Sequence, residues 1–263
     1  MIAAGCDVGS LTAKAFIMNE KGQLAGKIIR VRSMTVDSAT EVMEKALASA
    51  KLRFSDLDYC CSTGYGRYEI PFAQMNMSEI SCHGLGAFRA DRSIRTIIDI
   101  GGQDCKIILI DENGNVRDFI MNDKCAAGTG RSLEILARTI GVDLENLGYL
   151  ASQSKKPISI TNKCSIFMEL EVLNHLYTRK KLKHIACGIV DAVAKRVASM
   201  AKTIDIEDNL CITGGVSKNS GVVRQLAYHM NSSFKSLPVD PQIIGAMGAA
   251  VYAMEALKAK VEV

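Results

Sequence analysis

The sequence contains no pair of cysteines at the spacing Cys-x-x-Cys, although it has nine cysteines in 263 residues. A zinc finger or a ferredoxin-type cluster held by one local run of ligands is therefore excluded. The cysteines are odd in number and irregularly spaced, which argues against a disulfide framework. This pattern favours free thiols or metal ligation in a reducing compartment.

Signatures of several other protein classes are also missing. No GxxxxGK(S/T) run is present, so the chain has no P-loop. No apolar run reaches the roughly 18 residues of a membrane-spanning helix, and no signal-peptide pattern occurs at the N-terminus. Lys and Arg total 32 against 28 for Asp and Glu, with no basic block, which gives no argument for nucleic acid. The 48% of hydrophobic residues are ample for a core, so we expect a globular protein. From the missing signatures we expect it to be cytoplasmic, without a nucleic-acid or membrane partner.

A repeated segment organises the first half of the chain. Its first copy is expected to be a strand ending at Asp7, a tight turn at Gly9-Ser10 and a return strand through Phe16 and Ile17. The stretch IIDIGGQDCKIILIDENGNVRD matches it at an offset of 92 positions, which is 99 minus 7. The identical pairs are Asp7 and Asp99, Gly9 and Gly101, Lys14 and Lys106, Glu20 and Glu112, and Gly22 and Gly114. Five identities at one offset predict the duplication of one domain type.

Each copy places an aspartate at a strand end before a glycine turn, which suits a nucleotide phosphate. Glycine lets backbone N–H groups approach phosphate oxygens, and the carboxylate can hold hydrated Mg²⁺ or orient water. One Asp-x-Gly alone is ordinary hairpin chemistry, but its presence in both halves favours phosphate binding. A further turn, Gly214-Gly215 in NLCITGGVSKNSGVVRQL, is expected between a strand and a helix and suits an adenosine or α-phosphate.

Two cysteines stand in settings that favour an anionic sulfur. Cys125 lies in NDKCAAGTGRSLEIL, a loop of small residues that opens a helix, where Thr129 and Ser132 are expected to cap the free N–H groups. Cys164 lies in ITNKCSIFMELEV, before a helical pattern of apolar residues. Each follows a lysine, and Glu169 and Glu171 suit the dipole of the second helix. The alternative is a pair of buried structural cysteines.

The remaining elements are expected from turn signals and apolar spacing. His83 beside Cys82 suggests either a metal pair or, more simply, the start of a helix capped by Ser81. The tail from Pro241 is expected to form a helix that packs back across the first domain. Other expected elements are helices over 38–51, 144–151 and 183–202 and a strand over 57–62.

A set of motifs covers nearly the whole chain: DVGSLTAK, TGYGR, EISCHGLGA, DIGGQDCK, NDKCAAGTGR, GGVSKN and IIGAMGAA. Together they resemble the ATPase activators of 2-hydroxyacyl-CoA dehydratases, in the BadF/BadG/BcrA/BcrD ATPase family. NDKCAAGTGR is specific to the iron–sulfur ATPases, whereas the turns indicate only the acetate kinase, sugar kinase, Hsp70 and actin superfamily. The resemblance implies an α/β fold of duplicated ribonuclease-H-like domains with a nucleotide cleft between them. Residues 1–92 plus 241–263 would form one actin-like subdomain and residues 93–240 the other.

The resemblance also implies roles for individual residues. Cys125 and Cys164 from each copy of a homodimer would hold one four-iron four-sulfur cluster. We expect Asp7 and Asp99 to handle Mg²⁺ and water during ATP hydrolysis, with Gln103 positioning the attacking water. Further nucleotide contacts are expected from Gly9, Ser10, Leu11, Thr12, Lys14, Gly101, Gly102, Gly214, Gly215, Val216 and Gln242. A reduced ferredoxin or flavodoxin would load the cluster, and ATP would drive one electron to a 2-hydroxyacyl-CoA dehydratase or related acyl-CoA reductase.

Two other functions remain compatible with these motifs. A small-molecule kinase of the same fold would use Asp99 as the base that activates a substrate hydroxyl. A non-catalytic nucleotide sensor of the actin type would bind ATP with negligible turnover. Neither alternative explains NDKCAAGTGR. Within that family pattern, Lys163 stands before the second cysteine where a small hydroxyl residue is expected, and MELEV replaces a more polar Glu-Ser-Glu run.

Overall fold

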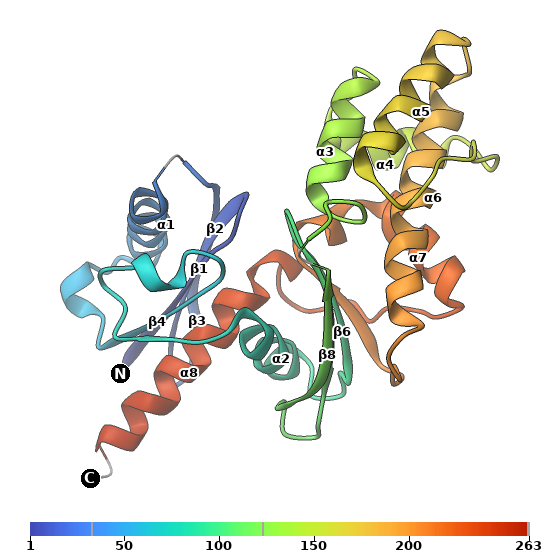
Figure 1. Cartoon of the computed structure of the whole chain (residues 1–263). Coiled ribbons are helices and arrows are strands. Elements are labelled where there is room, and N and C mark those ends of the chain that lie inside the picture. Colours follow the sequence, from blue (N-terminus) through green and yellow to red (C-terminus); the bar gives the residue numbers. More distant parts are fainter. Residues whose placement is uncertain (33, 123, 262–263) are drawn as a thin grey trace. The chain divides into compact units, whose positions relative to one another are not determined.

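A computed structural model describes residues 1–32, 34–122 and 124–261 (Figure 1). The chain divides into two compact units. Unit 1 comprises residues 1–97, 108–118 and 236–263, and unit 2 comprises residues 98–107 and 119–235. The subdomain bounds expected from the sequence, 1–92 plus 241–263 and 93–240, stay a prediction. Within the described residues, none of the helices combines the length and the apolar composition that crossing a membrane demands.

Unit 1 contains a five-stranded sheet in the order β3-β2-β1-β4-β5. β1 pairs antiparallel with β2 and parallel with β4, and β2 pairs antiparallel with β3. The strands are β1 (Ile2–Val8), β2 (Thr12–Asn19), β3 (Gly22–Arg30), β4 (Tyr59–Thr63) and β5 (Met75–Asn76). The helices are α1 (Thr35–Ala50), α2 (Glu79–Ala90) and α8 (Ile244–Val261), with short 3-10 turns at Phe54–Asp56, Arg67–Glu69 and Pro241–Ile243.

The two faces of this sheet build separate cores because successive strand residues point to opposite sides. On β1, Ala4 belongs to the core with α1, and Ala3 belongs to the core with α2 and α8. A side chain at Gly5 would collide with the backbone of Ala246, so glycine lets α8 lie directly against the strand. The tail helix therefore packs on the first half of the chain, as the sequence predicts.

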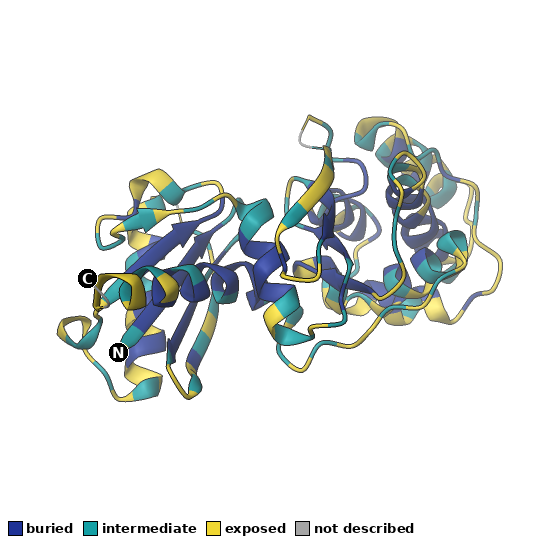
Figure 2. Ribbon diagram, turned by 90° about the horizontal axis from the view of Figure 1, so that it is seen from below, coloured by how far each residue is buried: buried dark blue, intermediate teal, exposed yellow. Residues whose placement is uncertain are grey.

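A second sheet has the strand order β8-β7-β6-β9, which repeats the first four positions of the other sheet. Its strands are β6 (Thr96–Ile100), β7 (Cys105–Ile110), β8 (Val116–Asn122) and β9 (Leu210–Thr213). The helices of unit 2 are α3 (Gly130–Thr139), α4 (Leu144–Ser152), α5 (Ser165–Tyr177), α6 (Leu182–Ala201) and α7 (Ser220–Met230), with a 3-10 turn at Gly215–Lys218. In Figure 2 the buried residues gather in the strands and on the inner faces of the helices of each unit.

Most expected elements agree with the structure to within a few residues, and one helix start does not. Ser78, rather than Ser81, caps α2 by accepting a hydrogen bond from the Ser81 N–H at 3.0 Å. The helix therefore begins earlier than predicted, and both Cys82 and His83 are buried inside it. The described residues contain no group of three His, Cys, Asp or Glu side chains that could hold a metal ion. The structure agrees with the helix interpretation of residues 82–83, with the cap at Ser78 instead of Ser81.

Candidate functional site

The first repeat places its aspartate at the end of β1 in unit 1. Asp7 is buried, and its Oδ2 lies 3.0 Å from Nζ of Lys14 on the neighbouring strand β2. The N–H of Gly9 donates to the Thr12 carbonyl at 3.0 Å and closes the turn between the strands. Residues 7–14 are called the first aspartate turn below. Gln242 reaches this turn, since its Nε2 donates to the Thr12 hydroxyl at 3.4 Å.

The second repeat builds the same turn in unit 2. The N–H of Gly101 donates to the Asp104 carbonyl at 3.0 Å, which is the bond of Gly9 to Thr12 moved by 92 positions. Lys106, the counterpart of Lys14, is buried with its Nζ 3.5 Å from Asp99 Oδ2 and 2.8 Å from Asp104 Oδ1. Residues 99–106 are called the second aspartate turn. The repeat read from the sequence is thus a structural repeat, and each turn holds a buried carboxylate against a lysine.

A glycine at the end of a neighbouring strand lies against each aspartate. Gly64 follows β4 with φ of +85°, and Gly214 follows β9 with φ of +81°, a region that favours glycine. A Cβ at Gly64 would collide with Asp7 Oδ1, and one at Gly214 would lie 2.8 Å from Asp99 Oδ1. Glycine at both positions therefore lets the backbone after β4 and β9 pack directly against the two carboxylates.

The other predicted nucleotide residues take the positions that the motifs require within their own unit. Gly9, Ser10 and Leu11 form the first turn, Gly101 and Gly102 form the second, and Gly214, Gly215 and Val216 lead from β9 into a 3-10 turn. Gln103 is exposed in the second turn, as a residue that handles solvent water would be. The nucleotide contacts and the cleft between the halves stay predictions.

Sequence reasoning missed two residues of the second turn and its surroundings. Asp104 occupies the position of Thr12 in the repeat and shares Lys106 with Asp99. The buried Thr213 donates its hydroxyl proton to Asp99 Oδ1 at 2.9 Å. A signal was present, because CSTG (residues 61–64) and CITG (residues 211–214) are a further repeat at a different offset.

Helix α3 starts against the second aspartate turn. Its first two N–H groups, of Gly130 and Arg131, donate to the carbonyls of Gly101 and Gly102 at 2.9 and 2.8 Å. These bonds satisfy two of the N–H groups that a helix leaves open at its start. The loop that carries Cys125 is thereby joined directly to the glycines predicted to bind phosphate.

The expected capping by hydroxyl side chains in this loop is wrong. Thr129 is the N-cap residue of α3 but makes no side-chain cap; its hydroxyl donates to the Ala126 carbonyl at 2.6 Å. The Ser132 hydroxyl donates to the Thr129 carbonyl at 2.8 Å. Both hydroxyls act as donors because the backbone carbonyls of the second turn already satisfy the helix start. Asn122 shapes the loop by donating to the Cys125 carbonyl at 2.9 Å, and Asp123 of the NDKC motif lies outside the described residues.

The two predicted ligand cysteines lie close to each other in unit 2. The Cys125 thiol donates to the carbonyl of Lys163, the residue before Cys164, at a sulfur–oxygen distance of 3.7 Å. Cys164 is the N-cap residue of α5, where the helix dipole favours negative charge. These two are half-buried, whereas the other seven cysteines are buried. Lys124 and Lys163 are both exposed beside them.

The glutamates of α5 anchor this helix instead of complementing its dipole. The Thr139 hydroxyl at the end of α3 donates to Glu169 at 3.0 Å, and the Thr161 N–H donates to Glu171 at 2.7 Å. Neither glutamate lies in the first turn of the helix, so the expected dipole role is wrong. Glu171 instead fixes the segment that leads into Cys164.

One face of α5 is apolar and exposed. Only Met168 and Val172 of the helix are buried. The side chains of Ile166, Phe167, Leu170 and Leu173 are between 47% and 67% exposed. Sequence periodicity identified these four residues as an apolar helical pattern, but the structure directs them away from the core of unit 2.

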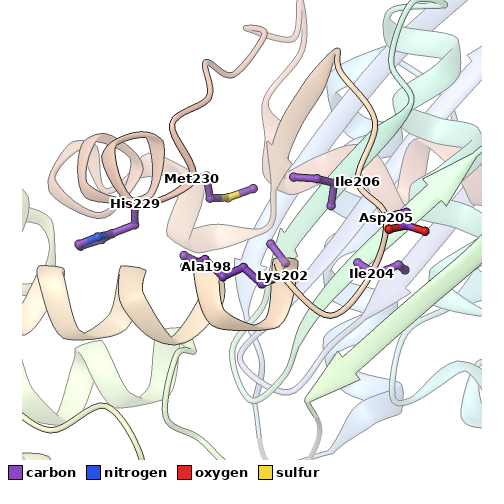
Figure 3. A pocket seen from close by; sticks show the side chains of 8 residues that line it. Ala198, Lys202, Ile204, Asp205, Ile206, His229 and Met230 are labelled. Carbon is purple, nitrogen blue, oxygen red and sulfur yellow. The ribbon is translucent and has the colours of Figure 1, made fainter.

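A hollow of about 360 Å³ in unit 2 lies apart from these features (Figure 3). It is lined by the C-terminal ends of α6 and α7 and by the loop after α6, including Lys202, Asp205, His229 and Met230. None of the predicted site residues lines it. Thr213 is the last residue of β9 and Gly214 follows it, whereas α6 and α7 reach the hollow with their final turns. The hollow therefore belongs neither to the second aspartate turn nor to the cysteine pair.

Comparison with known proteins places this arrangement in a family. The chain is 40% identical to the 2-hydroxyisocaproyl-CoA dehydratase activator of Clostridioides difficile, over 98% of this chain and 97% of that protein. It is 39% identical to the activator of lactoyl-CoA dehydratase of Anaerotignum propionicum, over 99% of this chain and all of that protein. A solved structure of the activator of the 2-hydroxyisocaproyl-CoA dehydratase from Clostridium difficile, with bound ADPNP, matches with a TM-score of 0.94 at 40% identity and covers 100% of this chain and 98% of that one.

The solved structures that the chain matches also confirm the expected fold class, an α/β fold of duplicated ribonuclease-H-like domains shared by actin-like ATPases and sugar kinases. A family model matches residues 4–253, a span that includes both aspartate turns and both half-buried cysteines. The chain therefore belongs to the BadF/BadG/BcrA/BcrD ATPase family.

Proposed function

We propose that this protein is an ATP-hydrolysing activator that delivers single electrons to an acyl-CoA enzyme through a four-iron four-sulfur cluster shared between two copies of the chain. The relatives' names support the kind of partner, a 2-hydroxyacyl-CoA dehydratase or related acyl-CoA reductase. The solved relative with ADPNP supports ATP as the nucleotide. The nine free thiols fit a reducing cytoplasm.

The observation that carries the proposal is the hydrogen-bonded connection between the second aspartate turn and the cysteines. Two backbone bonds join Gly101 and Gly102 to the start of α3, and the Cys125 thiol contacts the residue before Cys164. If the second aspartate turn moves when the γ-phosphate is lost, these hydrogen bonds would move the start of α3 and the loop that carries Cys125. An ATPase site and a pair of thiols joined in this way suit coupling of hydrolysis to electron transfer.

The cysteine pair fits half of an iron–sulfur site. A four-iron cluster takes four thiolates. The described part of one chain offers two half-buried cysteines, with Cys125 contacting the residue before Cys164 and no third ligand beside them. A second copy of the chain would supply the other two. When bound, such a cluster would store and release one electron. The exposed Lys124 and Lys163 add positive charge beside it. This charge stabilises the reduced form of the cluster, which carries one more negative charge than the oxidised form.

The chain's own residues would handle the nucleotide. Backbone N–H groups of the two aspartate turns would bind phosphate oxygens. Asp7 and Asp99 would hold hydrated Mg²⁺ and the attacking water, with Gln103 beside that water. Gly214 leaves room for the adenosine side of the nucleotide at the helix that follows. Lys14 and Lys106 neutralise the buried carboxylates and the phosphates. These roles rest on the paired turns and on their lysines.

Coupling to ATP is needed because the proposed electron acceptor, a CoA thioester, is difficult to reduce. Adding one electron to a CoA thioester requires a very negative potential, and each shortfall of about 60 mV costs about 1.4 kcal/mol for a one-electron step. A reduced ferredoxin or flavodoxin would load the electron, and hydrolysis would make its onward transfer irreversible. An electron that the dehydration returns would serve many turnovers, so ATP would be needed only to start the cycle.

The exposed apolar face of α5 supports the homodimer. α5 begins at Cys164, so a shared cluster brings the second copy to the start of this helix. Ile166 and Phe167 lie within its first turn and are 67% and 62% exposed. Exposed apolar groups gathered on one face mark interaction sites more often than isolated ones do. We assign this face to the second copy of the chain.

The proposal is tested by counting iron and acid-labile sulfide in protein purified under strict exclusion of oxygen. About four of each per dimer are expected for the wild type. Cys125→Ala and Cys164→Ala should each lose the cluster and electron transfer while keeping nucleotide affinity. Cys187→Ala, which changes a buried cysteine of α6, is the matched control and should keep its iron.

A folded dimer that binds ATP but contains no iron would overturn the proposal. In that case Cys125 and Cys164 would be ordinary thiols and not cluster ligands. ATP-dependent phosphorylation of an acceptor by that protein would then indicate a kinase, and binding without turnover would indicate a nucleotide sensor. A full iron complement in Cys125→Ala would exclude Cys125 as a ligand.

A further inference from the structure

The two halves of the chain hold their aspartates differently, although their sequences repeat. In each half a strand ends in the motif Cys-x-Thr-Gly. In residues 61–64 the first three residues end β4, and in residues 211–214 the first three residues end β9. Asp7 is paired with Thr63 in the register of β1 and β4. The Thr63 hydroxyl nevertheless donates to the Met77 carbonyl at 3.0 Å. The corresponding hydroxyl of Thr213 donates to the Asp99 carboxylate instead.

The lysines beside the two aspartates also differ between the two halves. Lys14 lies 3.0 Å from Asp7 Oδ2. Lys106 lies closer to Asp104, at 2.8 Å, than to Asp99, at 3.5 Å. Asp104 stands where the first repeat has Thr12. The second repeat therefore has an additional carboxylate, and Lys106 lies closer to it than to Asp99. Asp99 is thereby held through both oxygens, by a hydroxyl on Oδ1 and at longer range by an ammonium on Oδ2.

We propose that Thr213 is a positioning residue for ATP hydrolysis, which holds the Asp99 carboxylate through Oδ1 so that Asp99 orients the attacking water. This inference rests on the proposed ATPase function and deepens it by naming the residue that positions Asp99. A carboxylate less closely paired with a cation is the stronger hydrogen-bond acceptor for water. A hydroxyl donor fixes its rotamer without cancelling its charge.

The step balances as a hydrolysis. The water oxygen forms a bond to the γ-phosphorus while the bond from that phosphorus to the bridging oxygen of ADP breaks. The water proton passes to Asp99 and then to the inorganic phosphate that leaves. Thr213 exchanges no proton in this step, because its hydroxyl only donates a hydrogen bond to the carboxylate. Its loss should therefore lower kcat more than it changes the affinity for ATP.

The experiment compares three variants of the full chain, purified without oxygen, by steady-state ATP hydrolysis. Thr213→Val removes the hydroxyl at nearly constant shape and should lower kcat about 10- to 100-fold with KM for ATP almost unchanged. Thr213→Ser keeps the donor and should restore most of kcat. Thr63→Val is the matched control at the same position of the repeat, and its kcat should stay close to the wild-type value.

Three results would overturn the inference: a kcat for Thr213→Val equal to that of Thr63→Val, a loss that Thr213→Ser does not restore, or a rise in KM without a fall in kcat. Electron transfer to a partner is measured in a separate assay. A wild-type protein that hydrolyses ATP without reducing a partner would contradict the proposed activator function but leave the comparison at Thr213 valid. The two failures are therefore distinguishable.

Discussion

The nine cysteines fall into two groups according to their surroundings. Seven are buried, and burial raises the pKa of the thiols of Cys6, Cys60, Cys82 and Cys105 above the ordinary value. A raised thiol pKa means that the neutral form persists at higher pH, and the neutral thiol is neither a good nucleophile nor a good metal ligand. Cys125 and Cys164 are the two half-buried cysteines. Local setting thus separates the two proposed ligands from the structural thiols.

This separation predicts the pattern of thiol alkylation in iron-free protein. At pH 8, iodoacetamide should modify Cys125 and Cys164 quickly, because both are accessible, and the seven buried thiols only slowly. Labelling of the buried group should stay slow as the pH rises through 9, because burial raises the pKa of thiols such as Cys60 and Cys105. Mass spectrometry of peptides after short labelling measures this directly. Rapid labelling of Cys60 or Cys105 in folded protein would contradict the burial.

A second prediction concerns Asp99, the aspartate that we propose orients the attacking water. Asp99→Asn should lower ATP hydrolysis by about 10² or more, in the range of acid–base groups, because an amide accepts a proton far less readily than a carboxylate. The variant should keep its iron and sulfide, since Asp99 is not among the cluster cysteines. Turnover and metal content are measured on the same preparation. Unchanged turnover would remove Asp99 from the mechanism.

At the scale of elements, α3 and α5 connect the second aspartate turn to the cysteines. α3 starts on the second aspartate turn, and its last residue, Thr139, donates to Glu169 of α5. α5 starts at Cys164 and exposes an apolar face. A helix anchored at both ends moves as a rigid body, so a shift at the turn would reach α5. The sequence pattern could not separate a buried apolar face from one that a second copy covers, because both have helical spacing.

The assignment of the α5 face to a second copy gives the third prediction. Phe167→Glu places a charge on this face and should convert the dimer to a monomer with loss of the cluster, because each monomer keeps only two thiolates. Size-exclusion chromatography with light scattering, together with iron analysis, measures both effects. Tyr228→Glu, at an exposed aromatic residue of α7, is the control and should stay dimeric. An intact dimer that fails only to reduce its partner would assign the face to that partner instead.

At the scale of the whole molecule, the chain repeats one turn chemistry in two units. Each unit contains a buried carboxylate, a lysine seven positions later and a glycine turn closed by the same backbone hydrogen bond. Duplication repeats this turn in both units, and Asp104, where the first repeat has Thr12, is one position at which the two copies differ. The cysteine loop is an addition that only unit 2 carries.

Nucleotide binding by the whole chain gives the fourth prediction. A ligand that binds only the folded state stabilises it by about 2.7 kcal/mol at 100 times its Kd. A Mg²⁺-bound non-hydrolysable ATP analogue should therefore raise the apparent melting temperature of the wild type by several degrees. Cys125→Ala should show the same shift, because the cysteine loop is not required for phosphate contacts. A shift that disappears in Cys125→Ala would show that the cluster is needed for nucleotide binding.

The sequence by itself determined the repeat, the family and the candidate residues on the two aspartate turns. These features depend only on the order and spacing of residues that are close together in the chain. A glycine turn after a strand-end aspartate needs only neighbouring residues to form, and it recurs where the spacing recurs. The two segments around Cys125 and Cys164 likewise predicted these cysteines as cluster ligands from adjacent residues, a role that stays a prediction. The positions of the helices followed from apolar periodicity, with their ends shifted by a few residues where caps such as Ser78 were decided by geometry.

Only the tertiary structure decided which distant residues meet. Thr213 reaches Asp99 across 114 positions, α3 starts on the carbonyls of the second turn, and Glu171 holds the segment before Cys164. These contacts depend on strand order and helix packing, which bring together residues that no local pattern links. Strand order places Thr213 against Asp99, and that contact distinguishes two aspartates whose sequence surroundings are alike.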